Sequence, residues 1–153
     1  MEISFYDTRV IDSHITLVKE RTVECLINRV SKPLYAVELI NSTASLNELG
    51  EEHCYMVALD QKAMPLGIFL ITKGTVCQCM VGMREVYMRV LLVGAVQIFF
   101  FHNHPTGDVV PSRLDMELTD RLKKAGELMG IPLVDHIIIG GDGYFSFKEH
   151  GML

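Results

Sequence analysis

The feature that most constrains this chain is an apolar run that ends in two histidines. Residues 96–101 are almost continuously apolar, which predicts a buried strand covered on both faces. His102 and His104 follow directly. Because side chains alternate along an extended segment, the two imidazoles project to the same side. The sequence therefore predicts a strand that brings two imidazoles together at its end.

A carboxylate is placed to join these imidazoles. Asp115 is expected in the first turn of the next helix, after a proline- and glycine-containing loop at residues 105–111. Three protein ligands plus one water position are typical of a catalytic zinc rather than a structural one. A polar loop and a helix cap would explain each residue alone. The combination predicts a metal site formed by His102, His104 and Asp115.

The helix that carries Asp115 has clear start and stop signals. Ser112 precedes Asp115 by three residues, which predicts a capping box, and the helix is expected to run to about Met129 before Gly130 ends it. Ser112 has two interpretations. It caps the helix, or its hydroxyl stabilises the oxyanion of a tetrahedral intermediate. Both roles are compatible if the backbone caps the helix and the hydroxyl faces the metal.

The remaining patterns predict a mixed α/β (α+β) domain. Three short strands in series suggest an antiparallel meander, whereas residues 1–13 carry little signal. Ser31 is expected as the cap of the first helix, with Pro33 in its first turn. The expected strands are residues 14–20, 52–59, 64–72, 75–80, 96–101, 131–139 and 144–147, and the expected helices are residues 33–41, 83–94 and 111–129.

Length and charge narrow the class of protein. A chain of 153 residues suits a single domain, in which residues 1–45 add a strand and a helix to a main domain at residues 46–153. The 14 basic and 19 acidic residues give a net charge of −5, which argues against a mainly electrostatic grip on DNA. The hydrophobic fraction of 49% suggests a sheet covered on both faces or an apolar surface for self-association, so it is compatible with a homodimer.

The sequence does not predict export or membrane insertion. Charged residues interrupt the N-terminus, and the most apolar stretch, residues 90–101, is too short to span a bilayer. The expected location is therefore cytoplasmic, with reduced thiols. Cys77 and Cys79 could form half of a soft metal site, but no second pair accompanies them, so small buried strand residues are the preferred interpretation.

A catalytic zinc also needs a group that moves protons. A nearby carboxylate can take the proton of the attacking water and pass it to the leaving amine. Glu51 and Glu52 stand at the head of the first core strand and are the best-placed acids in the sequence. Either residue could equally be solvated at a strand end. Composition and spacing do not choose between them.

The segment resembles the JAMM signature of the JAB/MPN metalloprotease superfamily. That signature is an upstream Glu, then His-x-His, seven residues, Ser, two residues and Asp; this chain matches it without a gap at His102, His104, Ser112 and Asp115. More narrowly, residues 46–153 resemble the RadC-like branch of bacterial proteins. The matching features are Glu52-His53, Leu59-Asp60, Gly74-Thr75, Arg84-Glu85 and the segments 102–107, 111–119 and 135–140.

The resemblance implies an MPN fold, a mixed sheet flanked by helices and related in outline to cytidine deaminases. It implies one Zn²⁺ per chain, held by His102, His104 and Asp115 with a water as the fourth ligand. It implies that Glu52 is the general acid/base, which chooses between the two glutamates, and that Ser112 stabilises the oxyanion. The implied activity is that of a zinc-dependent peptidase or isopeptidase acting on a peptide or protein substrate.

Two departures from the family pattern narrow the partners. Longer RadC-like proteins carry an N-terminal helix-hairpin-helix-like region for which this chain has no room, which weighs against DNA as a partner. The insertions that bind ubiquitin in eukaryotic deubiquitinating relatives are absent, so a ubiquitin substrate is not expected. Asn103 stands where eukaryotic relatives have Ser or Thr, but Asn is usual in the RadC-like branch.

One motif of the resemblance, Asp135-His136, is not required by the JAMM mechanism. It predicts either a structural role, with Asp135 bonded to His136 or to a backbone amide, or a role in orienting a zinc ligand. The leading functional prediction is a zinc-dependent metallohydrolase. The alternatives are a DNA-repair-associated protein or nuclease, and a non-catalytic interaction module that keeps the fold.

Overall fold

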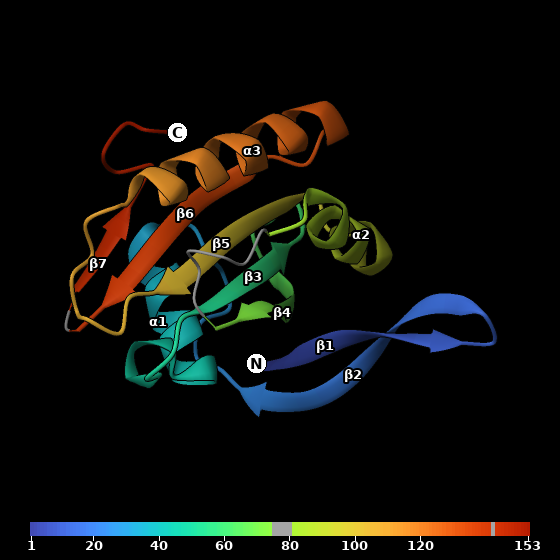
Figure 1. The fold of residues 1–153 in the computed structure, drawn as a ribbon. Helices are drawn as coiled ribbons and strands as arrows, with labels where there is room; N and C mark the ends of the chain where they lie inside the picture. Colours follow the sequence, from blue (N-terminus) through green and yellow to red (C-terminus); the bar gives the residue numbers. More distant parts are fainter. Residues whose placement is uncertain (75–80, 142) are drawn as a thin grey trace.

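The computed structural model describes residues 1–74, 81–141 and 143–153. Along these residues the elements are β1 (Glu2–Ile11), β2 (His14–Glu24), α1 (Pro33–Ala44), the 3₁₀ helix η1 (Leu46–Glu48), β3 (His53–Leu59), β4 (Pro65–Lys73), α2 (Met83–Val93), β5 (Gln97–Asn103), α3 (Arg113–Met129), β6 (Leu133–Gly140) and β7 (Gly143–Ser146). The seven strands of this described part form one mixed sheet in the order β2-β1-β4-β3-β5-β6-β7 (Figure 1).

Helices cover both faces of the sheet. Alternate residues of β5 point to opposite sides, because Phe99 and Phe101 pack with the buried residues of α1, whereas Ile98 and Phe100 pack with those of α2 and α3. Figure 1 shows α2 and α3 on one side of the sheet and α1 on the other. The predicted mixed sheet flanked by helices is therefore confirmed.

The connections around β5 bring the end of β5, the start of α3 and the start of β3 close together. β5 and β6 are parallel neighbours joined through α3, whereas β3 runs antiparallel on the other side of β5. A parallel pair needs a crossover connection, so α3 starts near the C-terminal end of β5. The antiparallel pairing places the start of β3 beside this same end of β5, where Cys54 lies opposite His102.

The N-terminal residues form a strand that the sequence analysis did not anticipate. β1 pairs antiparallel with β2, which forms the edge of the sheet, and it meets β4 where Phe5 lies opposite Ile68. Ile3 and Phe5 are buried in the core, but most of the other positions of β1 are at least partly exposed. Because the burial alternates only over the first few residues, the period-two signal of this strand is weak.

The expected cap of α1 is wrong. Lys32, not Ser31, is the N-cap residue, and its side chain makes no capping hydrogen bond. Pro33 stands in the first turn, as predicted. A backbone N–H at this position has no acceptor within the helix, so proline costs no helical hydrogen bond there. The helix also continues to Ala44 rather than ending near residue 41, and the buried Thr43 packs in this additional turn.

The other described elements lie within a few residues of their expected bounds. β3 and β4 are antiparallel, as the meander predicts, and Gly94 ends α2 with a left-handed φ of 73°. The expected strand at residues 75–80, with Cys77 and Cys79, lies outside the described residues. Among the helices of the described chain, none combines the length and apolar character needed to cross a membrane. The division of the chain at residue 45 stays a prediction.

Candidate metal centre

The two histidines meet at the end of β5, on the side of the sheet that α3 covers. His102 is fully buried in the strand, and His104 is the first residue beyond it. The backbone N–H of His104 donates to the carbonyl oxygen of Ile139 on β6 at 2.8 Å, which continues the parallel pairing. The Nε2 atoms of the two imidazoles are 3.0 Å apart. The structure therefore brings the two rings together, as the alternation along the strand predicts.

Asp115 joins the imidazoles from the first turn of α3. Its buried carboxylate accepts the backbone N–H of Ser112 through Oδ2 at 2.7 Å and so closes the capping box. Oδ1 lies 3.1 Å from Nε2 of His102, and Oδ2 lies 3.7 Å from Nε2 of His104. The capping bond thus orients the carboxylate toward the rings. The helix cap and the candidate ligand are the same group.

These three side chains fit a zinc ion. One donor atom from each residue can be chosen so that all lie within 4.8 Å of one another. Zinc–nitrogen bonds of about 2 Å at a tetrahedral angle place two nitrogen ligands about 3.3 Å apart. The observed separation of the Nε2 atoms, 3.0 Å, is close to this value. Two imidazoles and one carboxylate also match the donor types of catalytic zinc sites.

A backbone carbonyl fixes the ring of His104. Its Nδ1 lies 2.7 Å from the carbonyl oxygen of Asp108, and because a carbonyl oxygen only accepts, Nδ1 carries the proton and donates. In the neutral ring Nε2 then holds a lone pair directed into the site. The loop that supplies this carbonyl packs on the end of β6, where a Cβ on Gly140 would lie 2.8 Å from the carbonyl oxygen of Gly107.

The charges of the cluster are coupled in the metal-free protein. The pKa of His104 is raised, chiefly by its interaction with the Asp115 carboxylate, while burial acts in the opposite direction. Burial alone would raise the pKa of Asp115, but the imidazoles of His102 and His104 beside its oxygens hold that pKa well below its usual range. The Asp115 carboxylate is therefore ionised at neutral pH and offers a buried negative charge to a cation.

The structure distinguishes the two glutamates that composition left open. The side chain of Glu51 is exposed, and its carboxylate lies 3.3 Å from Nζ of Lys73 on the neighbouring strand. Glu52 is half-buried, and its charge adds to that of Asp115 in raising the pKa of His104. The charge of Glu52 therefore acts at the candidate metal site, and its role as the general acid/base stays a prediction.

Asn103 ties the segment around Glu52 to the histidine-bearing strand. Its Oδ1 accepts the backbone N–H of His53 at 2.7 Å, and its Nδ2 donates to the carbonyl oxygens of Leu49 and Glu51, each at 3.0 Å. These bonds fix the backbone on both sides of Glu52. In the sequence Asn103 stands out only as a family variation, although an amide between two candidate ligands is a signal for such a role.

Replacing Asn103 by alanine should lower the free energy of unfolding by about 2–3 kcal/mol, because the buried N–H of His53 loses its acceptor. Denaturant unfolding of the metal-free protein measures this change. Asn47→Ala, at an exposed position of η1, is the control and should cost less than about 0.5 kcal/mol. Equal losses in the two variants would contradict the role of Asn103 in holding the backbone around Glu52.

Ser112 is the N-cap of α3, as predicted. Its Oγ accepts the backbone N–H of Asp115 at 3.2 Å. This bond uses a lone pair of the oxygen and not the hydroxyl proton. The side chain is exposed next to the buried Asp115 carboxylate. Its role toward an oxyanion stays a prediction.

The two residues of the Asp135-His136 motif have separate roles. Nε2 of His136 lies 2.9 Å from Nδ1 of His102, and its Nδ1 lies 2.6 Å from Oγ1 of Thr119. The carboxylate of Asp135 instead accepts hydrogen bonds from the Ser146 hydroxyl and from a backbone N–H in the C-terminal turn. His136 therefore stands behind a candidate ligand, whereas Asp135 is structural. From the sequence both roles stay open, and Thr119 enters only as the last residue of the matching segment 111–119, with no role of its own.

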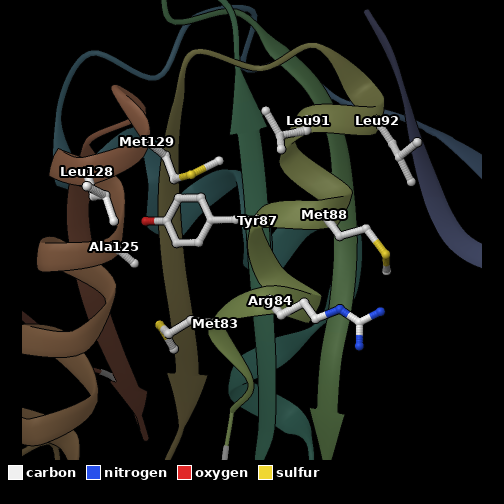
Figure 2. A pocket seen from close by; sticks show the side chains of 9 residues that line it. All are labelled: Met83, Arg84, Tyr87, Met88, Leu91, Leu92, Ala125, Leu128 and Met129. Atoms are coloured by element: carbon white, nitrogen blue, oxygen red, sulfur yellow. The ribbon is translucent and has the colours of Figure 1, made fainter.

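A separate apolar groove lies between α2 and α3. It encloses about 540 Å³ and is lined by Met83, Arg84, Tyr87, Met88, Leu91, Leu92, Ala125, Leu128 and Met129 (Figure 2). None of the three candidate ligands lines this groove. Among the described residues, its lining holds neither a carboxylate nor an imidazole, the groups that acid–base or zinc chemistry would need. The histidine cluster is therefore the better candidate for the chemical site.

Comparison with known proteins identifies the family of this chain. A family model described as the RadC-like JAB domain matches residues 30–152. The UPF0758 protein of Clostridium beijerinckii is 36% identical over 135 residues, which cover 87% of this chain and 58% of that protein. The UPF0758 protein of Thermotoga maritima is 37% identical over 134 residues, which cover 88% and 57%.

The chain spans about half the length of the curated relatives it matches. A further UPF0758 protein, from Rubrobacter xylanophilus, is 43% identical over 105 residues, which cover 69% of this chain and 46% of that protein. The family model, in contrast, matches most of this chain. The chain belongs to the RadC-like JAB domain family.

Proposed function

We propose that this protein is a zinc-dependent metallohydrolase of the peptidase or isopeptidase class, acting on a peptide or protein substrate. The observation that carries the proposal is the convergence of His102, His104 and Asp115 on one point. The side chain of His104 remains 15% exposed, so the cluster can be reached from solvent, as a catalytic site must be. Two imidazoles and an ionised carboxylate form a donor set suited to a divalent cation.

The neighbouring side chains supply the remaining steps of hydrolysis. Zinc bound at this site would lower the pKa of a coordinated water to about 7 and polarise the scissile carbonyl. Glu52 takes a proton from the water as its oxygen bonds to the carbonyl carbon. Glu52 then gives this proton to the amine nitrogen as the carbon–nitrogen bond breaks, which leaves a carboxylic acid and an amine.

Ser112 and Asn103 support this reaction in two different ways. The Ser112 hydroxyl donates to the developing oxyanion, and its capping bond does not compete, because that bond uses a lone pair of the same oxygen. Asn103 holds the backbone that flanks Glu52 and so limits the positions its carboxylate can take. Positioning of this kind is a large part of catalytic power.

The test joins metal content to peptide cleavage. Protein purified without added zinc should contain about one zinc per chain, as a three-ligand site predicts. It should cleave members of a peptide library, and a chelator should abolish this cleavage until zinc is restored. A folded protein that takes up no zinc on titration would overturn the metal site. A zinc-loaded protein that cleaves neither peptide nor isopeptide bonds would overturn the assigned reaction.

A further inference from the structure

We propose that Thr119 and His136 are positioning residues that set the tautomer of His102, so that its Nε2 lone pair faces the metal. The inference rests on the metal site of the proposed function. It extends that site from the ligands to the side chains behind them. Neither Thr119 nor His136 belongs to the ligand set, and both act through His102.

The three side chains form a continuous buried line from α3 through β6 to β5. Oγ1 of Thr119 lies 2.6 Å from the carbonyl oxygen of Asp115 and 2.6 Å from Nδ1 of His136. Nε2 of His136 lies 2.9 Å from Nδ1 of His102. Thr119 is 4% exposed and both imidazoles are fully buried. Burial makes each of these bonds important, because water cannot replace a partner that an inaccessible polar group loses.

The hydroxyl proton of Thr119 determines which atom donates in each hydrogen bond of this line. The Thr119 hydroxyl has one proton, and the carbonyl oxygen of Asp115 can only accept, so the hydroxyl donates to that oxygen. Oγ1 therefore meets His136 as an acceptor, and Nδ1 of His136 carries the proton of its neutral ring. Nε2 of His136 then accepts the N–H at Nδ1 of His102. His102 is left with an unprotonated Nε2, which lies 3.0 Å from Nε2 of His104.

The surroundings of His136 favour its neutral ring. The ring stacks on Phe147 with the ring centroids 4.9 Å apart, and it meets the edge of Phe100 at 5.4 Å. A charged imidazolium between two aromatic side chains and away from water would be costly. A neutral ring has one donor and one acceptor, which is the pair of roles that this line requires.

The opposite arrangement of protons would block the metal. If Thr119 donated to His136, the carbonyl oxygen of Asp115 would lose this donor. His136 would then present an N–H to His102, which would have to carry its own proton on Nε2. That proton would occupy the lone pair that zinc needs. Asp115 thus contributes twice, because its carboxylate is a candidate ligand and its carbonyl directs the tautomer of another.

Thr119→Val removes the hydroxyl and keeps the shape of the side chain. The zinc dissociation constant, measured by competition with a chelating dye, should rise about 10–100-fold, the usual effect of losing a group that orients a ligand. Thr119→Ser restores the hydroxyl and should return the constant to that of the unaltered protein. The matched control is Thr43→Val on α1, a buried threonine whose hydroxyl also donates to the carbonyl four residues earlier at 2.6 Å. This control should leave zinc affinity unchanged.

Nitrogen NMR of protein with isotope-labelled histidine tests the protons directly. His136 should be protonated at Nδ1 and not at Nε2, in metal-free and zinc-loaded protein alike. A proton on Nε2 of His136, or unchanged zinc affinity in Thr119→Val, would overturn the inference. A protein that shows the expected tautomer but binds no zinc would support the proton arrangement and refute the proposed function, so the two failures are distinguishable.

Discussion

Replacing Asp115 by asparagine should remove zinc from the protein and leave its fold intact. The amide offers one neutral oxygen in place of an ionised carboxylate, so zinc affinity should fall by at least about 100-fold. This loss exceeds the effect expected for Thr119→Val, because Asp115 is itself a candidate ligand. The helix cap should survive, because the amide oxygen can still accept the Ser112 N–H that the carboxylate accepts at 2.7 Å. Metal analysis and circular dichroism of the purified variant measure the two outcomes.

The matched control for this prediction is Asp120→Asn on the same helix. The Asp120 carboxylate is exposed and lies 2.7 Å from Nζ of Lys124. Exposed pairs of this kind contribute about 0–1 kcal/mol, so this variant should keep both its zinc and nearly all its stability. If Asp115→Asn kept its zinc as well, capping α3 would be the sole role of Asp115.

Local sequence signals were enough to predict the ligand cluster. The two histidines share a side because of strand alternation, and Asp115 is directed by a capping box that spans only the four residues 112–115. The loop between them is short, which limits how far the carboxylate can lie from the rings. Each of these signals acts within about ten residues of sequence, so the apolar pattern and the cap residues reveal it.

The supporting bonds depend on contacts between distant segments, so local patterns could not predict them. His136 stands 34 residues from His102, and Asn103 stands 50 residues from the N–H that it accepts. Both bonds require the observed register of β5 against its neighbours. A shift of one residue would turn His136 to the other face of the sheet, and the sequence contains no local signal for that register.

Residues 102–104, at the end of β5 and just beyond it, therefore link the candidate metal site to the proposed acid/base. His102 and His104 face the cluster under α3, while the intervening Asn103 bonds to the backbone around Glu52. Alternation along one strand thus connects the candidate metal ligands to the position of the proposed general base. Glu52 lies between the two backbone groups that Asn103 holds, the carbonyl of Glu51 and the N–H of His53. The side chain of Glu51, in contrast, is exposed and faces Lys73.

Replacing Glu52 by glutamine should abolish most of the hydrolysis and leave zinc in place. Glutamine has nearly the same shape as glutamate but cannot take the proton of the attacking water. Losing a general acid/base typically lowers the rate by about 10²–10⁴-fold. The zinc content should stay near one per chain, because Glu52 is not among the candidate ligands. The rate of cleavage of a library-derived peptide at saturating concentration, beside metal analysis, measures both effects.

Glu51→Gln makes the same change of charge one residue away and is the matched control. Because the Glu51 carboxylate is exposed and faces Lys73, this variant should cleave the peptide within about twofold of the original rate. Equal losses in the two variants would mean that the local negative charge matters and that proton transfer does not run through Glu52. Full activity in Glu52→Gln would show that another group carries the proton, and the assignment of Glu52 would be wrong.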